Sequence, residues 1–205
     1  MSSLIKFRDV SLFKDKDFGI IDVSFDIQKR KKIHFTLATQ EKLKTLQGLI
    51  EGRFQPGSGI ARRSDRIFIQ SDRLLLGDKI YTKNAGNWLK LQDEFFYFDG
   101  KRRSKRTFLN ELNARHIRHF PIYRLKGEDR IKFTLLALTF QETGLLLISN
   151  LLSSPLSSTL AQHLERLVNG THCTLCLFSA LDPPPNKNYS FLKNPNLEQI
   201  DLRSA

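Results

Sequence analysis

Residues 125–151 read LKGEDRIKFTLLALTFQETGLLLISNL, a helical pattern followed by an aliphatic run. From Glu128 to Phe140 the apolar residues recur at helical spacing. The segment from Gly144 to Asn150 is almost uniformly aliphatic, which is typical of a strand buried on both faces. A helix at 159–168 and a strand at 173–178 are expected next. Because strands that alternate with helices build parallel sheets, this half of the chain predicts an α/β fold.

The N-terminal half begins with β-structure and continues as a strand followed by a helix. Apolar and polar residues alternate at 4–12 and 20–27, which predicts two half-buried strands. A third strand is expected at 33–37 and a helix at 40–51, where Gly52 is a typical stop signal. Residues 55–59 form a turn cluster, and another short strand is expected at 66–70.

The middle of the chain breaks this pattern, because residues 74–123 are rich in charge and aromatic side chains. We interpret them as a separate, partly helical lobe. The sequence therefore predicts a single domain over residues 1–182 with an inserted lobe at about 74–123. The tail at 183–205 begins with Pro183, Pro184 and Pro185 and is expected to be extended or docked.

Composition indicates an ordinary globular protein with an unusual charge. The chain has 205 residues, two cysteines, a hydrophobic content of 40% and a net charge of +12. No export signal precedes the first strand, and the aliphatic runs fall short of the roughly 20 residues of a membrane span. We expect a cytoplasmic protein that reaches a membrane only through a partner. The charge favours nucleic acid, anionic lipid headgroups or an acidic protein surface as neighbours.

Several local strings recur in the order in which one ATPase family has them. Residues 8–12 read RDVSL, residues 22–27 read DVSFDI, and the first helix is followed by a Pro-x-Ser-Gly turn at 56–59. The frame of 125–151 matches the family's signature loop, helix and aliphatic strand without gaps. On these strings the chain resembles the nucleotide-binding domain of ABC transporter ATPases over residues 4–180. The resemblance implies a P-loop NTPase-like α/β fold with a mainly parallel sheet, an N-terminal antiparallel β part and an inserted helical lobe.

The resemblance places the family's phosphate loop on a segment that lacks its glycines and lysine. The three loop glycines, the lysine and the magnesium-binding hydroxyl correspond in this order to Leu37, Gln40, Lys42, Leu43 and Lys44, with Thr45 next. Glycines let backbone amides approach the phosphates, and the lysine supplies positive charge. Leu43 supplies none. The flanking lysines either contact an anion or are surface residues at the start of a helix.

The remaining family motifs are also substituted, apart from the Q-loop glutamine at Gln70. That residue acts either as a hinge or as a polar strand end. The signature loop corresponds to Leu125, Lys126, Gly127, Glu128 and Asp129. Ser149 and Asn150 replace the magnesium-binding and catalytic carboxylates, and no histidine follows the last strand at 177–182. The resemblance thus implies a chain that does not hydrolyse ATP and uses no cofactor or metal.

In the family, the lobe between the Q-loop and the signature docks a membrane subunit. The partners implied are a membrane protein and a second ABC-ATPase-like domain, in a homodimer or heterodimer, beside an anionic lipid surface. The lobe offers apolar anchors and positive charge for this contact. The contact residues expected here are Trp88, Phe95, Phe96, Lys101, Arg102, Arg103, Lys105 and Arg106.

Two alternatives remain open at this point. One is a nucleic-acid-binding or scaffold protein on an α/β fold, for which Arg115, His116, Arg118 and His119 supply a basic stretch. The other is a weak enzyme with an atypical use of nucleotide. Cys173 and Cys176 have a Cys-x-x-Cys spacing, but they fall in an expected strand without a second pair, so we interpret them as packing residues.

Overall fold

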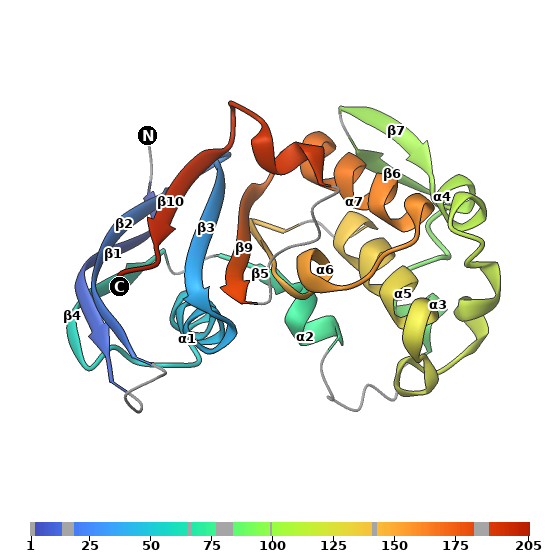
Figure 1. Ribbon diagram of the computed structural model, residues 1–205. Coiled ribbons are helices and arrows are strands. Elements are labelled where there is room, and N and C mark those ends of the chain that lie inside the picture. The colour runs from blue at the N-terminus through green and yellow to red at the C-terminus, as the bar shows by residue number, and fades with distance from the viewer. Residues whose placement is uncertain are drawn as a thin grey trace. The chain divides into compact units, whose positions relative to one another are not determined.

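The computed structural model describes residues 3–13, 19–64, 67–76, 84–98, 100–140, 143–182 and 189–205 (Figure 1). The chain divides into two compact units. Unit 1 consists of Met1–Ile69, Thr143–Ser153 and Cys173–Ala205, and unit 2 of Gln70–Glu142 and Ser154–His172. Within the ranges described, none of the helices combines the length and hydrophobicity that a transmembrane span requires.

The first sheet of unit 1 is antiparallel and has the strand order β2-β1-β4. It consists of β1 (Ser3–Leu12), β2 (Ile20–Gln28) and β4 (Ser58–Arg63). β1 pairs antiparallel with both of its neighbours. The expected N-terminal antiparallel part is therefore confirmed, with β4 as an additional strand.

The second sheet has the order β10-β3-β9-β8-β5. Its strands are β3 (Lys32–Thr39), β5 (Ile69–Ser71), β8 (Leu145–Ile148), β9 (Thr174–Asp182) and β10 (Glu198–Leu202). The pairs β10–β3, β3–β9 and β8–β9 are parallel, which confirms the predicted parallel sheet. The end of the tail at 183–205 thus forms β10, a strand of this sheet. Arg66, the first residue of the strand expected at 66–70, lies outside the described residues, as do Pro183, Pro184 and Pro185.

The helices in the described part of unit 1 are α1 (Gln40–Glu51), α6 (Asn150–Ser153) and the 3₁₀ helix η3 (Ser190–Lys193). α1 ends as predicted at Gly52, whose φ of 79° lies in the left-handed region that glycine adopts without strain. A chain of phenylalanine rings then links the two sheets. The ring centroids are 4.8 Å apart for Phe7 and Phe25, 5.0 Å for Phe25 and Phe35, and 5.2 Å for Phe35 and Phe178.

The described part of unit 2 is mainly helical and includes a β-hairpin. Its elements are α2 (Asp72–Leu76), α3 (Ala85–Trp88), β6 (Phe95–Phe98), β7 (Lys101–Ser104), α4 (Lys105–Glu111), η1 (Arg115–His119), η2 (Ile122–Arg124), α5 (Gly127–Phe140) and α7 (Ser158–Gly170). The lobe expected at 74–123 falls within this unit, which also includes α5 and α7. α5 is buried along nearly its whole length, so it forms the centre of the unit.

Aromatic side chains from the hairpin, α4 and α5 fill the core of unit 2. The Phe96 ring lies 5.2 Å from Phe108 and 4.7 Å from Phe140, centroid to centroid. The Lys105 ammonium is buried beside them and donates hydrogen bonds to the carbonyls of Leu89 at 3.1 Å and Lys90 at 2.8 Å. These two bonds offset the cost of burying the charge.

Candidate functional site

β3 runs directly into α1 in the segment on which the sequence resemblance places a phosphate loop. β3 ends at Thr39, and α1 begins at the next residue, Gln40. Thr39 is the N-cap of α1, and its hydroxyl accepts a hydrogen bond from the Lys42 backbone N–H at 3.3 Å. A phosphate loop needs several residues between strand and helix to wrap around the phosphates. Here the last residue of the strand is also the cap of the helix.

The apolar positions aligned with the phosphate loop lie in the core of unit 1. Leu37 belongs to β3, where it pairs with Ala180 of β9, and its side chain is buried. Leu43 is only 1% exposed and belongs to the same core. Thr45 is also buried, and its hydroxyl donates a hydrogen bond to the Glu41 carbonyl at 3.1 Å. These side chains stabilise α1 against the sheet.

The polar positions of the same segment lie in the first turns of α1. Gln40 is half-buried. The Lys42 ammonium donates a hydrogen bond to the backbone oxygen of Ala205, so it is held within the chain. The Lys44 ammonium is exposed and lies 3.9 Å from the Glu41 carboxylate, an i,i+3 pair of the kind that stabilises a helix only slightly.

Ser149 lies directly after β8, at the carboxyl end of the parallel sheet. Its hydroxyl donates a hydrogen bond to the side-chain oxygen of Gln47 in α1 at 3.1 Å, and both residues are buried. Asn150 begins α6, and its side-chain oxygen lies 3.4 Å from the same hydroxyl. The two positions aligned with metal-binding and catalytic carboxylates therefore belong to a neutral hydrogen-bonded group. Gln47 lies in the helix predicted at 40–51, and nothing in its local sequence indicated this role.

The residues aligned with the signature loop form the start of α5. Gly127 has a φ of 51°, the left-handed region where a side chain would add strain, which explains a glycine at this position. The carboxylates that follow are paired within unit 2. Glu128 lies 2.9 Å from the Lys132 ammonium, and Asp129 lies 3.0 Å from His116 Nε2. Leu125 is buried and Lys126 is exposed. Gln70 is a buried residue of β5.

The expected contact residues of the lobe divide into an exposed and a buried group. Phe95, Lys101, Arg102, Arg103 and Arg106 are exposed, and Trp88 is half-buried. Phe96 and Lys105 are buried in the core of unit 2 as described above, so the exposed surface does not include them. The outer face of the hairpin places the Arg102 guanidinium 4.0 Å from the centroid of the Phe95 ring, a cation–π contact.

A polar array that no sequence pattern had indicated crosses three strands of the parallel sheet, with His34 and Ser179 buried and Gln199 exposed. His34 of β3 lies 2.8 Å from Ser179 of β9 through Nε2, and 2.8 Å from the Gln199 side-chain oxygen of β10 through Nδ1. Burial lowers the pKa of His34, and the hydrogen bond with Gln199 opposes that shift. A histidine between two buried apolar residues of β3, Ile33 and Phe35, was the available signal.

The other residues that the sequence singled out are the Cys-x-x-Cys pair and the basic stretch at 115–119. Cys176 is buried in β9, and this burial raises the pKa of its thiol. Arg115, His116, Arg118 and His119 are exposed on η1. Among the residues that the structure describes, no group of three or more His, Cys, Asp and Glu side chains is placed to hold a metal ion.

Solved structures of ABC transporter proteins share this fold. A chain of a metal-chelate-type ABC transporter in an inward-facing conformation superimposes with a TM-score of 0.61 at 14% identity, over 98% of this chain and 80% of that chain. An ATP-binding protein of an ABC transporter from Pyrococcus furiosus gives a TM-score of 0.62 at 12% identity, over 97% and 96%.

A bacterial Atm1-family ABC exporter with ATP bound gives a TM-score of 0.61 at 13% identity, over 87% of this chain and 35% of that chain. The present chain thus spans about a third of the exporter chain. No protein-family model matches the sequence, and no curated protein does. At these identities the comparisons establish the fold, which is that of the P-loop ABC ATPases.

Proposed function

We propose that this chain is a non-catalytic ABC-ATPase-like subunit with a structural or regulatory role in a membrane-associated, transporter-like complex. The observation that carries the proposal is the direct junction of β3 and α1 at Thr39 and Gln40. It leaves no glycine-rich loop whose amides can surround a phosphate chain. The burial of Leu43 supports the same conclusion, because the aligned position offers an aliphatic side chain instead of an ammonium group.

The groups around Ser149 support the absence of hydrolysis. Magnesium-assisted phosphoryl transfer needs a carboxylate in the metal shell and a residue that orients the attacking water. Ser149 is instead hydrogen-bonded to the neutral Gln47, and Asn150 carries an amide, which is not a base. We therefore assign the fold a role in assembly, with a membrane protein and a second ABC-ATPase-like domain as partners.

The contact surface proposed for the membrane-protein partner is the exposed part of the β6–β7 hairpin and the start of α4. It combines Phe95 and Tyr97, which are 41% and 78% exposed, with the basic residues that follow them. Those basic residues are Lys101, Arg102, Arg103 and Arg106. Near an anionic bilayer, each contributes on the order of 1 kcal/mol to association.

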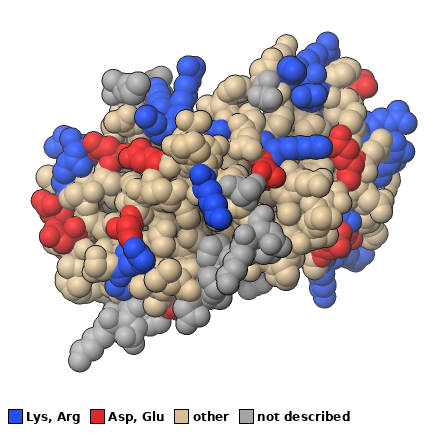
Figure 2. All heavy atoms as spheres, turned by 45° about the horizontal axis from the view of Figure 1, so that its top comes forward, with Lys and Arg blue, Asp and Glu red and all other residues tan. Residues whose placement is uncertain are grey.

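The nucleic-acid alternative requires a continuous basic surface that follows a phosphate backbone. On the face shown in Figure 2, lysines and arginines have aspartates and glutamates beside them. This distribution favours contact with a protein on that face.

Membrane fractionation in cells that contain the partner tests the proposal. We expect simultaneous reversal of Lys101, Arg102, Arg103 and Arg106 to glutamate to release the protein from membranes without changing its circular dichroism spectrum. Lys105 stays unchanged because it is buried. A matched control reverses the same number of exposed charges elsewhere in unit 2, at Lys90, Arg115, Arg118 and Arg124. A native protein that stays soluble beside its partner, or that co-purifies with nucleic acid in a salt-dependent way, contradicts the proposal.

A further inference from the structure

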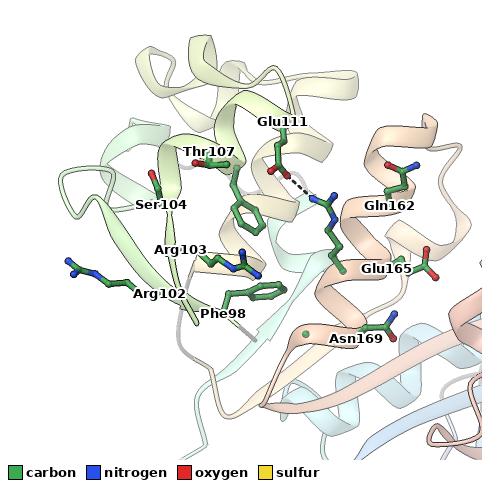
Figure 3. Close-up of a pocket in the computed structure, with 12 residues that line it drawn as sticks. Phe98, Arg102, Arg103, Ser104, Thr107, Glu111, Gln162, Glu165 and Asn169 are labelled. Carbon is green, nitrogen blue, oxygen red and sulfur yellow. Dashed lines mark hydrogen bonds and ion pairs between the residues drawn. The ribbon is translucent and has the colours of Figure 1, made fainter. Parts of the chain in front are cut away.

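A hollow of about 890 Å³ lies within unit 2, between the β6–β7 hairpin, α4 and α7 (Figure 3). This volume is within the range of clefts and cavities that bind ligands, roughly 300–1,000 Å³. Two phenylalanines, Phe98 and Phe108, line it, with their ring centroids 5.8 Å apart. Part of the lining is therefore apolar and suited to an apolar side chain.

The neutral polar residues of the hollow come from two sides. The hairpin and α4 contribute hydroxyl groups, and α7 contributes amide groups, all of which can donate hydrogen bonds. These residues are Ser104, Thr107, Gln162 and Asn169.

Among the charged residues of the hollow that the structure describes, Arg103 differs from Arg166. Arg166 lies 2.7 Å from the Glu111 carboxylate, so these two charges pair. Figure 3 shows Arg103 directed into the hollow beside Phe98, whereas Arg102 and Glu165 point away from it. Within the part of the chain that the structure describes, the Arg103 guanidinium makes no hydrogen bond or ion pair. A guanidinium with free donors beside hydroxyl and amide groups suits a carboxylate, which it binds with two parallel hydrogen bonds.

We infer that this hollow binds an acidic peptide segment of the membrane-protein partner. A carboxylate of the segment pairs with Arg103, and a neighbouring apolar side chain packs on Phe98. The inference rests on the proposed function, because it assigns the segment to that partner. A free phosphate would satisfy Arg103 but would leave the apolar lining and most of the volume unfilled.

Fluorescence anisotropy with the purified chain tests this inference. The probe is a fluorescein-labelled hexapeptide that alternates leucine and glutamate, and the comparison peptide alternates leucine and glutamine. We expect the acidic peptide to bind at least tenfold more tightly than the neutral one, since a charge-assisted pair contributes about that factor. Arg103→Gln removes this preference. Gln162→Glu weakens binding because it adds a negative charge to the α7 wall. Arg118→Gln, an exposed charge outside the hollow, leaves the affinity unchanged.

Three results would overturn the inference: equal binding of the two peptides, binding that does not depend on Arg103, or displacement of the peptide by millimolar inorganic phosphate or by a single-stranded oligonucleotide. Membrane fractionation of the wild-type chain, run beside the peptide assay, separates this inference from the proposed function. If the wild-type chain associates with membranes through its partner but does not bind the peptide, only the inference fails. If it binds the peptide but never associates with membranes, the proposed function fails together with the assignment of the segment to that partner, while peptide binding by the hollow stands.

Discussion

At the level of one residue, the proposed loss of ATP binding rests most directly on Leu43. The position aligned with the phosphate-binding lysine holds a leucine in the core of unit 1, packed with the other apolar side chains of α1. A lysine there would need its ammonium group in an apolar environment without a partner, and such burial is costly.

Restoring the lysine should therefore damage the protein without creating an enzyme. We expect Leu43→Lys to lower the free energy of unfolding by about 3 kcal/mol or more, which lowers Tm by roughly 6–12 °C in a chain of this size. It should gain no ATPase activity, because the metal-binding and catalytic carboxylates are still missing. Leu43→Met is the matched control and should cost less than about 1.5 kcal/mol. Differential scanning calorimetry and a phosphate-release assay measure both effects, and measurable turnover in Leu43→Lys would show that the active site has been misplaced.

At the level of elements, the Ser179–His34–Gln199 array ties β10 and β9 to β3. Both imidazole nitrogens have partners at 2.8 Å, so the buried ring is satisfied in its neutral form. Burial lowers the pKa of His34 below its usual 6.5. The unfolded chain therefore takes up a proton at a higher pH than the folded chain does. The array contributes its full stability above about pH 6.5, and this stability is lost as the pH falls through that value toward the folded pKa.

Acidification should consequently destabilise the protein through His34. In urea denaturation between about pH 7 and pH 5, the free energy of unfolding should fall by up to roughly 1.4 kcal/mol per pH unit for this group. His34→Gln removes the titration and should flatten this dependence. His172→Gln, which removes an exposed imidazole, serves as the control. Burial also lowers the pKa of His163 in unit 2, so a smaller slope of the same sign should remain in His34→Gln. An unchanged slope in His34→Gln would contradict this account of the array.

The elements with strong local signals were predictable, and those that depend on distant pairing were not. α1 has both an apolar period and a glycine stop, and it was predicted at its observed bounds. β4 was missed because Ser58–Arg63 has no buried alternation and forms by pairing with β1. The β6–β7 hairpin was missed because its second strand is mostly charged. β10 was missed because it is a short edge strand that depends on β3.

At the level of the whole molecule, the sequence predicted the frame of the candidate site but not its hydrogen bonds. The alignment placed Ser149 after an aliphatic strand and Lys42 at the start of a helix, as observed. Their partners, Gln47 and Ala205, are distant in sequence, and only the folded chain brings them close. The hollow beside Arg103 was likewise unpredictable, since its walls come from segments about 60 residues apart.

Isothermal titration calorimetry with MgATP tests the central claim most directly. The β3–α1 junction, the buried Leu43 and the neutral Ser149–Gln47 pair predict no binding in the micromolar range and no release of phosphate on prolonged incubation. A hydrolysing ABC ATPase measured alongside serves as the positive control. Micromolar binding, or turnover that Asn150→Ala abolishes, would contradict the claim that this ABC-ATPase fold acts without ATP.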